Sequence, residues 1–163
     1  ELVFGIHPIV ELLKAKQRKL TVVYTTKPEP KSWDQIARLL PKGTQIQYVT
    51  RDVLAKLAGT IDHQGVVAFA TPFVYRKKFF DPAKQPFLLL LDSIQDPRNT
   101  GAIIRSAYCT GVQGVIIVQK GAAPLTATAL KSSAGLAEHM SIYQAPSTKA
   151  AVQLLKEAGY GLY

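Results

Sequence analysis

The chain has 163 residues, 47% of them apolar, and a net charge of +9 at neutral pH, so it is long enough for one domain or two small ones. It contains no run of about 18 apolar residues and no basic region followed by an apolar stretch, so we expect neither a membrane span nor a secretory signal. The single cysteine excludes an internal disulfide and favours a reducing, cytoplasmic setting.

The positive charge is concentrated in the first half of the chain. Residues 1–86 carry 14 Lys/Arg and seven Asp/Glu, whereas residues 87–163 carry six and four. Such a surface attracts phosphate-rich partners, and binding through it weakens as salt rises. A solvated basic face that serves only solubility is the alternative, and charge alone leaves both readings open.

Residues 1–73 predict a compact α/β unit. Pro8 lies near a helix start, and Ile9, Leu12 and Leu13 follow at helical spacing. Alternating apolar and polar residues indicate strands between the helices. The predicted helices cover 5–17, 33–40 and 51–59, and the predicted strands cover 21–26, 44–50 and 65–73.

Residues 74–86, VYRKKFFDPAKQP, interrupt this pattern with a basic and aromatic cluster and two prolines, and we interpret them as a linker. Arg76, Lys77 and Lys78 stand beside aromatic side chains that could stack on RNA bases while the cations contact phosphates. The alternative is a hinge whose aromatic side chains pack on a neighbouring domain.

Residues 87–163 predict parallel β-α-β units. The strand at 87–92 is apolar on both faces, as in a strand that is covered on both sides. A helix from about Thr100 to Gly111 leads by a right-handed crossover into a parallel strand at 114–118. Further helices are expected at 124–133 and 148–159, and further strands at 140–144 and from 161 onward.

The loop 92–99 follows the first strand of this part, and ligands of open α/β sheets gather at the carboxyl ends of strands. Asn99 is therefore a candidate site residue, although it could also be the N-cap of the next helix. Arg105 lies in the second turn of that helix beside Ile103 and Ile104, and a snorkelling arginine is the structural alternative.

A second candidate site is the turn HQGVVAF at 63–69, in which His63 and Gln64 could present hydrogen-bonding groups to a nucleic acid. Gly65 could simply relieve the turn. No metal site is expected, because His7, His63 and His139 are scattered along the chain. Cys109 falls in a predicted helix, where we expect a buried structural thiol.

The chain also lacks the glycine patterns of phosphate-binding loops, which disfavours a nucleoside triphosphatase or a dinucleotide enzyme. A nucleotide-binding α/β enzyme of another class, which would use the loop 92–99, is therefore only a weak functional hypothesis.

Four stretches in the same order and spacing resemble the SpoU (TrmH-like) branch of the SPOUT superfamily, the knotted RNA 2′-O-ribose methyltransferases. The longest is DSIQDPRNTGAIIRSAYCTGVQGVIIV at 92–118, which resembles the first signature motif of that family. The others are GIHPIVELL at 5–13, HQGVVAF at 63–69 and APLTATALKSSAGLAEHMSIYQ at 123–144.

The resemblance implies an α/β protein in which residues 1–73 form a small RNA-binding domain, similar to ribosomal proteins that bind kinked RNA. Residues 87–163 would form the first half of a parallel-sheet methyltransferase domain. Proteins of this family form homodimers, bind S-adenosylmethionine in a trefoil knot near the C-terminus and methylate a ribose 2′-hydroxyl. The expected substrate is ribosomal RNA, with transfer RNA second.

The same resemblance assigns catalysis to Asn99 and Arg105. A ribose hydroxyl is a poor nucleophile, so the enzyme must align it and help to remove its proton. Arginine side chains stay protonated at neutral pH, so the expected role of Arg105 is to orient the ribose or phosphate and stabilise charge on the oxygen, with a general-base role as the family alternative. Asn99 would orient Arg105 or the ribose, and Glu138 is expected to be structural.

The motifs that form the knot in this family are not found in residues 1–163. We therefore expect the S-adenosylmethionine pocket beyond Tyr163, and a truncated chain that is inactive by itself. The competing hypothesis is a non-catalytic RNA-binding protein, which would bind RNA in a salt-sensitive manner without methyl transfer.

Overall fold

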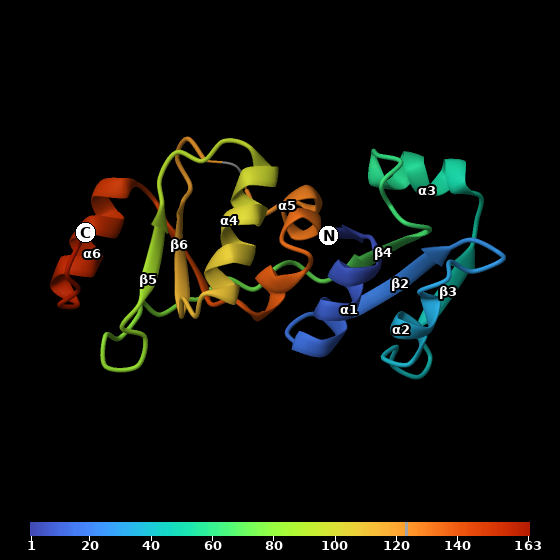
Figure 1. Cartoon of the computed structure of the whole chain (residues 1–163), viewed down its shortest axis with the longest axis horizontal. Helices are drawn as coiled ribbons and strands as arrows, with labels where there is room; N and C mark the ends of the chain where they lie inside the picture. Colours follow the sequence, from blue (N-terminus) through green and yellow to red (C-terminus); the bar gives the residue numbers. More distant parts are fainter. Residues whose placement is uncertain (123) are drawn as a thin grey trace. The chain divides into compact units, whose positions relative to one another are not determined.

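The computed structural model describes residues 1–122 and 124–163. Ala123, the first residue of the fourth stretch that carries the resemblance, lies outside the described residues. The chain divides into two compact units, Glu1–Val74 and Tyr75–Tyr163, which are described separately (Figure 1).

The first unit is a four-stranded mixed sheet with helices on both faces (Figure 1). Its strand order is β1-β4-β2-β3, with β2 and β3 parallel and β4 antiparallel to β1 and β2. In Figure 1, α1 and α2 lie on one side of the sheet and α3 on the other. The strands are β1 Leu2–Phe4, β2 Leu20–Thr25, β3 Gln45–Tyr48 and β4 Val66–Ala70, and the helices are α1 Ile6–Ala15, α2 Trp33–Ala37 and α3 Arg51–Ala58.

Local signals explain most of these boundaries. The Thr50 hydroxyl accepts a hydrogen bond from the backbone N–H of Val53 at the start of α3, and Gly59 ends the helix with a φ of 67°. Helix α2 is shorter than predicted, because the residues before Pro41 form a turn and the α conformation is disfavoured directly before proline. Strand β1 was not predicted, since three residues are too few to show a period of two.

The second unit contains a parallel three-stranded sheet in the order β5-β6-β7, which confirms the predicted parallel pairing of 87–92 with 114–118. Figure 1 shows α6 on one face of this sheet and α4 and α5 on the other. The strands are β5 Leu88–Leu91, β6 Gly114–Val118 and β7 Ile142–Ala145, and the helices are α4 Pro97–Cys109, α5 Ala127–Ser132, the short 3-10 helix η1 Leu136–His139 and α6 Thr148–Glu157.

Helix α4 begins three residues earlier than predicted. Asp96 is its N-cap, with the carboxylate accepting a 2.8 Å hydrogen bond from the backbone N–H of Arg98, and Pro97 follows at the first helical position. The alternative that Asn99 caps this helix is therefore wrong. Asn99 lies inside the first turn, and its side chain is exposed.

Three further expectations for the second unit need correction. Residues 161–163 form no strand in this structure. Leu88, Leu89 and Leu90 are only partly buried, because β5 is an edge strand of the described sheet, whereas β6 in the middle is buried throughout. Cys109 is exposed, since the last turn of α4 directs it away from the helices that cover Ala107.

The segment interpreted as a linker contributes to the core of the second unit from Tyr75 onward. Phe80 is 3% exposed and packs with Ile116, Ala145 and Leu155. The backbone N–H of Arg76 donates to the Ile142 carbonyl at 2.7 Å. The aromatic side chains thus pack on a domain, as the alternative interpretation required.

Packing of Phe80 on the sheet depends on the glycine at the start of β6. A Cβ atom added at Gly114 would lie 2.2 Å from the Phe80 ring, so Gly114→Ala should displace the ring and lower the free energy of unfolding by about 2 kcal/mol. Urea denaturation of the full-length protein measures this change. When Phe80→Leu is combined with Gly114→Ala, the smaller side chain should remove most of the loss in free energy of unfolding that Gly114→Ala causes. If the two losses simply add in the double variant, the proposed contact is contradicted.

Candidate functional site

The loop after β5 is connected to the first residue of α6. The Asp92 carboxylate accepts hydrogen bonds from the Ser93 hydroxyl at 3.0 Å and from the Thr148 hydroxyl at 2.6 Å. Ser93 has a φ of 56°, a left-handed conformation that is uncommon outside glycine and turns the chain sharply after the strand. These contacts hold the start of the loop at the carboxyl edge of the sheet, where α/β proteins bind ligands.

A pocket of about 280 Å³ lies at the ends of β6 and β7, on this same edge. Two amide side chains are the polar groups in its wall, and the Gln119 amide N–H donates to the Gln144 carbonyl oxygen at 3.4 Å. Sequence reasoning did not single out these glutamines. The available signal was their position at or just after the ends of two adjacent parallel strands. The pocket is lined by Ile117, Val118, Gln119, Ala122, Pro124 and Gln144.

The predicted catalytic residues Asn99 and Arg105 both lie on α4 and are exposed. They are six residues apart, which separates them by about 9 Å along the helix axis and about 120° around it. Within residues 1–122 and 124–163, neither side chain has a hydrogen-bond or ion-pair partner. The structure therefore does not bring Asn99 into contact with Arg105, and both side chains are accessible to a ligand.

A second arginine lies near Arg105 on the surface of α4. Arg98 is exposed, and a separation of seven residues places it on almost the same face of the helix. Sequence reasoning missed Arg98, because its position on the outer face becomes clear only when Thr100, Gly101 and Ile104 are seen to be buried. The two guanidinium groups make this face of α4 positively charged.

Both candidates at 63–64 make contacts within the first unit, although only His63 is buried and Gln64 is exposed. His63 is 2% exposed, and its Nδ1 accepts a 3.0 Å hydrogen bond from the backbone N–H of Gly65. The Gln64 side-chain oxygen accepts a hydrogen bond from the backbone N–H of Ile6 at 3.0 Å, which satisfies one of the donors at the start of α1. Both contacts support the turn and the adjoining helix.

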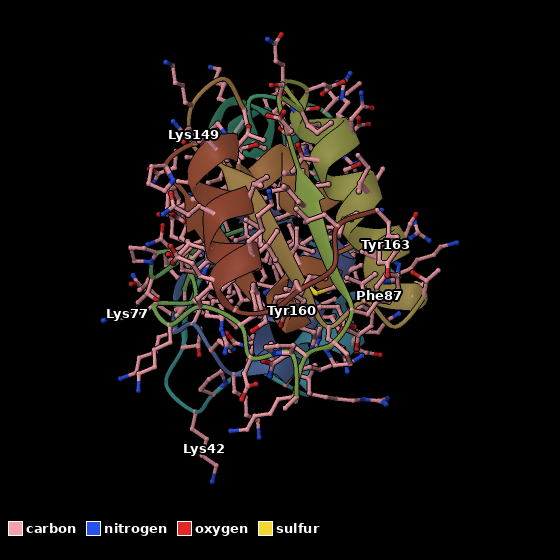
Figure 2. The ribbon with its side chains drawn as sticks, turned by 90° about the vertical axis from the view of Figure 1, so that its left-hand side faces the viewer. Lys42, Lys77, Phe87, Lys149, Tyr160 and Tyr163 are labelled. Atoms are coloured by element: carbon pink, nitrogen blue, oxygen red, sulfur yellow. The ribbon has the colours of Figure 1, made fainter. Side chains whose placement is uncertain are left out.

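The three basic residues at 76–78 differ in their contacts and exposure. The Arg76 guanidinium donates to the carbonyls of Lys78 at 2.6 Å and Phe79 at 3.3 Å, and lies 4.7 Å from the centre of the Phe80 ring. These contacts give Arg76 a role in folding the segment. Lys77 and Lys78 are exposed, and Figure 2 shows Lys77 extending away from the ribbon.

Glu138 is 2% exposed within η1, a position that agrees with the structural role expected for it. Among the described residues, no group of three His, Cys, Asp or Glu side chains is arranged to hold a metal ion. No helix in the described part of the chain combines the length and the apolar character needed to cross a membrane.

Two family models match the chain, one after the other. The model described as "RNA 2′-O ribose methyltransferase substrate binding" matches residues 2–76, and the model of the "SpoU rRNA Methylase family" matches residues 86–163.

Curated relatives and solved structures agree with these matches. The 23S rRNA (guanosine-2′-O-)-methyltransferase RlmB of Acinetobacter baylyi is 37% identical, over 88% of this chain and 61% of its own length. The enzyme of the same name from Shewanella oneidensis is 32% identical, over 98% of this chain and 68% of its own length. A crystal structure of an RNA 2′-O ribose methyltransferase superimposes with a TM-score of 0.80 at 20% identity, over 96% of this chain and 59% of that one. The chain thus spans about three fifths to two thirds of the length of these proteins.

Proposed function

Because the chain belongs to the SpoU rRNA methylase family, we propose that it acts in the transfer of a methyl group from S-adenosylmethionine to a ribose 2′-hydroxyl of RNA. The consecutive match of a substrate-binding model and a methylase model to residues 2–76 and 86–163 is the observation that carries this proposal. Ribosomal RNA is the proposed substrate, since two relatives are named as 23S rRNA methyltransferases. Transfer RNA is the second candidate.

In this proposal the two units have different roles in binding the RNA and in acting on it. The first unit, with most of the positive charge, binds the RNA, and Lys77 and Lys78 of the second unit add phosphate contacts of their own. The second unit presents α4 to the target nucleotide. The full-length protein is proposed to be a homodimer, as the family resemblance implies, and to work in the cytoplasm, where ribosomal RNA is available.

Arg105 and Asn99 are the proposed catalytic residues. The guanidinium of Arg105 can donate up to five hydrogen bonds to a phosphate or to the 2′-oxygen, and it would stabilise the negative charge that develops as the hydroxyl loses its proton. The Asn99 amide would orient the ribose directly, because it does not contact Arg105 in this structure. Arg98, on nearly the same face, would add a phosphate contact.

The pocket beside Gln119 and Gln144 does not by itself enclose a ligand as large as S-adenosylmethionine. It has about 280 Å³ and six lining residues, which is below the usual size for sites that enclose ligands of this size, about 300–1,000 Å³. We propose, as the resemblance implies, that residues outside 1–163 hold the cofactor.

Methyl transfer to ribose is the direct test. The full-length protein is incubated with tritiated S-adenosylmethionine and unmodified 23S rRNA, with unmodified tRNA as the matched control. We expect label in the rRNA within dinucleotides that resist alkali, because a 2′-O-methyl group blocks hydrolysis at that phosphate. Label on a base would contradict the proposed reaction. RNA binding without any label would instead favour the non-catalytic RNA-binding protein.

A further inference from the structure

Tyr48 occupies an unusual position at the edge of the first unit. It is the last residue of the edge strand β3 and is paired with Thr25, the last residue of the parallel strand β2. Its side chain is 48% exposed. The carboxyl ends of these two strands therefore carry a large aromatic ring on the surface.

Two neighbouring side chains lie beside this ring. The ammonium group of Lys27 lies 5.0 Å from the ring centre, in cation–π contact. The nearby Glu29 carboxylate, as an acceptor for the Tyr48 hydroxyl, raises the pKa of Tyr48. The pKa of Glu29 is lowered by a backbone hydrogen bond and then by this contact with Tyr48.

The surroundings of the ring combine apolar surface with positive charge. Ile46 is 37% exposed and lies two residues before Tyr48 on the same face of the strand. Two further cations of the same unit, Lys31 in the loop after β2 and Arg51 at the start of α3, are exposed. Glu29 is the only acidic residue between β2 and α2, and its carboxylate is engaged by Tyr48 and Lys27.

We propose that Tyr48 is a stacking platform for an unpaired RNA base and that Lys27 contacts the adjoining phosphate. Exposed aromatic rings beside cations recognise single-stranded RNA in this way, whereas the bases of a duplex are stacked internally and cannot reach the ring. On binding, a base takes the place of the Lys27 ammonium group on the ring and the lysine moves to the phosphate. The class of partner rests on the proposed function, and the site itself rests on the geometry around Tyr48.

The first test measures the affinity of the full-length protein for a fluorescent single-stranded RNA 12-mer and for a hairpin of the same composition. Stacking on one base corresponds to roughly a ten-fold effect, so Tyr48→Ala should weaken binding of the single strand about ten-fold. Tyr48→Phe keeps the ring and should stay within about two-fold of the wild type. Hairpin binding should change much less in both variants.

The contribution of the Lys27 charge to RNA binding is tested against a matched control. Lys27→Gln should weaken single-strand binding and reduce the slope of log affinity against log salt by about 0.7. Lys42→Gln removes the same charge from an exposed turn of the same unit, where Figure 2 shows the side chain extending away from the ribbon. This control should leave the affinity nearly unchanged. Equal effects of the two substitutions would show that only net charge matters.

Photocrosslinking locates the contact independently of any folding defect. The wild-type protein is irradiated with the 12-mer carrying 5-iodouridine, and the crosslinked peptide is identified by mass spectrometry. We expect the crosslink at Tyr48. Crosslinks only at other aromatic residues, or equal loss of affinity in Tyr48→Ala for single strand and hairpin, would overturn the proposal.

The outcome is separable from that of the methylation test. If rRNA is methylated but Tyr48→Ala leaves the KM for RNA unchanged, the stacking site is wrong and the enzymatic function stands. If no methyl group is transferred but Tyr48 crosslinks to the 12-mer, the stacking site stands and the enzymatic function fails.

Discussion

Arg105→Ala in the full-length protein is expected to lower the rate of methyl transfer by at least about 100-fold, the usual effect of removing a hydrogen-bond donor that stabilises developing negative charge. The affinity for S-adenosylmethionine should stay close to that of the wild type, because the proposed role of Arg105 is to contact the ribose or phosphate and not the cofactor. Single-turnover methylation and cofactor titration measure the two quantities separately. The defect should therefore appear in kcat.

Arg98→Ala is the matched control for this prediction. It removes the same charge from nearly the same exposed face of α4, and we expect it to raise the KM for RNA several-fold with little change in kcat. Arg105→Lys keeps the charge but loses the fork of donors, so partial activity is expected. Activity of Arg105→Ala equal to that of Arg98→Ala would remove Arg105 from catalysis and leave it as a phosphate contact.

Gly101→Ala is expected to have the largest effect on stability, through the contact between α4 and α5. A Cβ atom at this position would lie 2.2 Å from the Ala129 carbonyl oxygen and 2.9 Å from the backbone nitrogen of Ser133. Since these are backbone atoms, α5 must move as a whole. We expect the free energy of unfolding to fall by about 3 kcal/mol, at the upper end for overpacked cores.

The sign of this change is diagnostic, because Gly→Ala inside a helix otherwise stabilises it by about 1 kcal/mol. Ala102→Gly, at the exposed neighbouring position, is the control and should cost about 1 kcal/mol from helix propensity alone. Hydrogen exchange measured by mass spectrometry on the full-length protein should locate the loss of protection in α4 and α5. An increase in stability in Gly101→Ala would contradict the close packing of these helices.

Close helix packing also explains why the two candidate catalytic residues are exposed. Ser132 donates its hydroxyl to the Arg98 carbonyl at 2.7 Å, and this contact together with Gly101 directs the Thr100 and Ile104 side of α4 inward. Asn99 and Arg105 are left on the outer surface. A substitution at Gly101 that shifts α4 should thus affect the proposed catalytic surface as well as stability.

Much of the fold follows from local sequence signals. The apolar run GVIIV predicts the buried strand β6 at its observed bounds, and Gly59 marks the end of α3 at the predicted residue. These signals suffice because a buried strand must be apolar on both faces and a left-handed helix end favours glycine. The order of quoted motifs likewise indicated the family to which the chain belongs.

The tertiary structure decided the roles of individual residues, because those roles depend on contacts between segments that are distant in sequence. The sequence left His63 and Gln64 open between a structural role and RNA contact, and the fold added their contacts in the turn before β4. The Gln64 side chain reaches Ile6, which is 58 residues away along the chain, and it is also exposed, so its contact with RNA stays a prediction. Tyr48 and Lys27 stand in different segments with no shared motif, and only the parallel pairing of β2 with β3 brings them together. Sequence periodicity reports which face of an element is apolar, whereas the partner of that face is decided by packing.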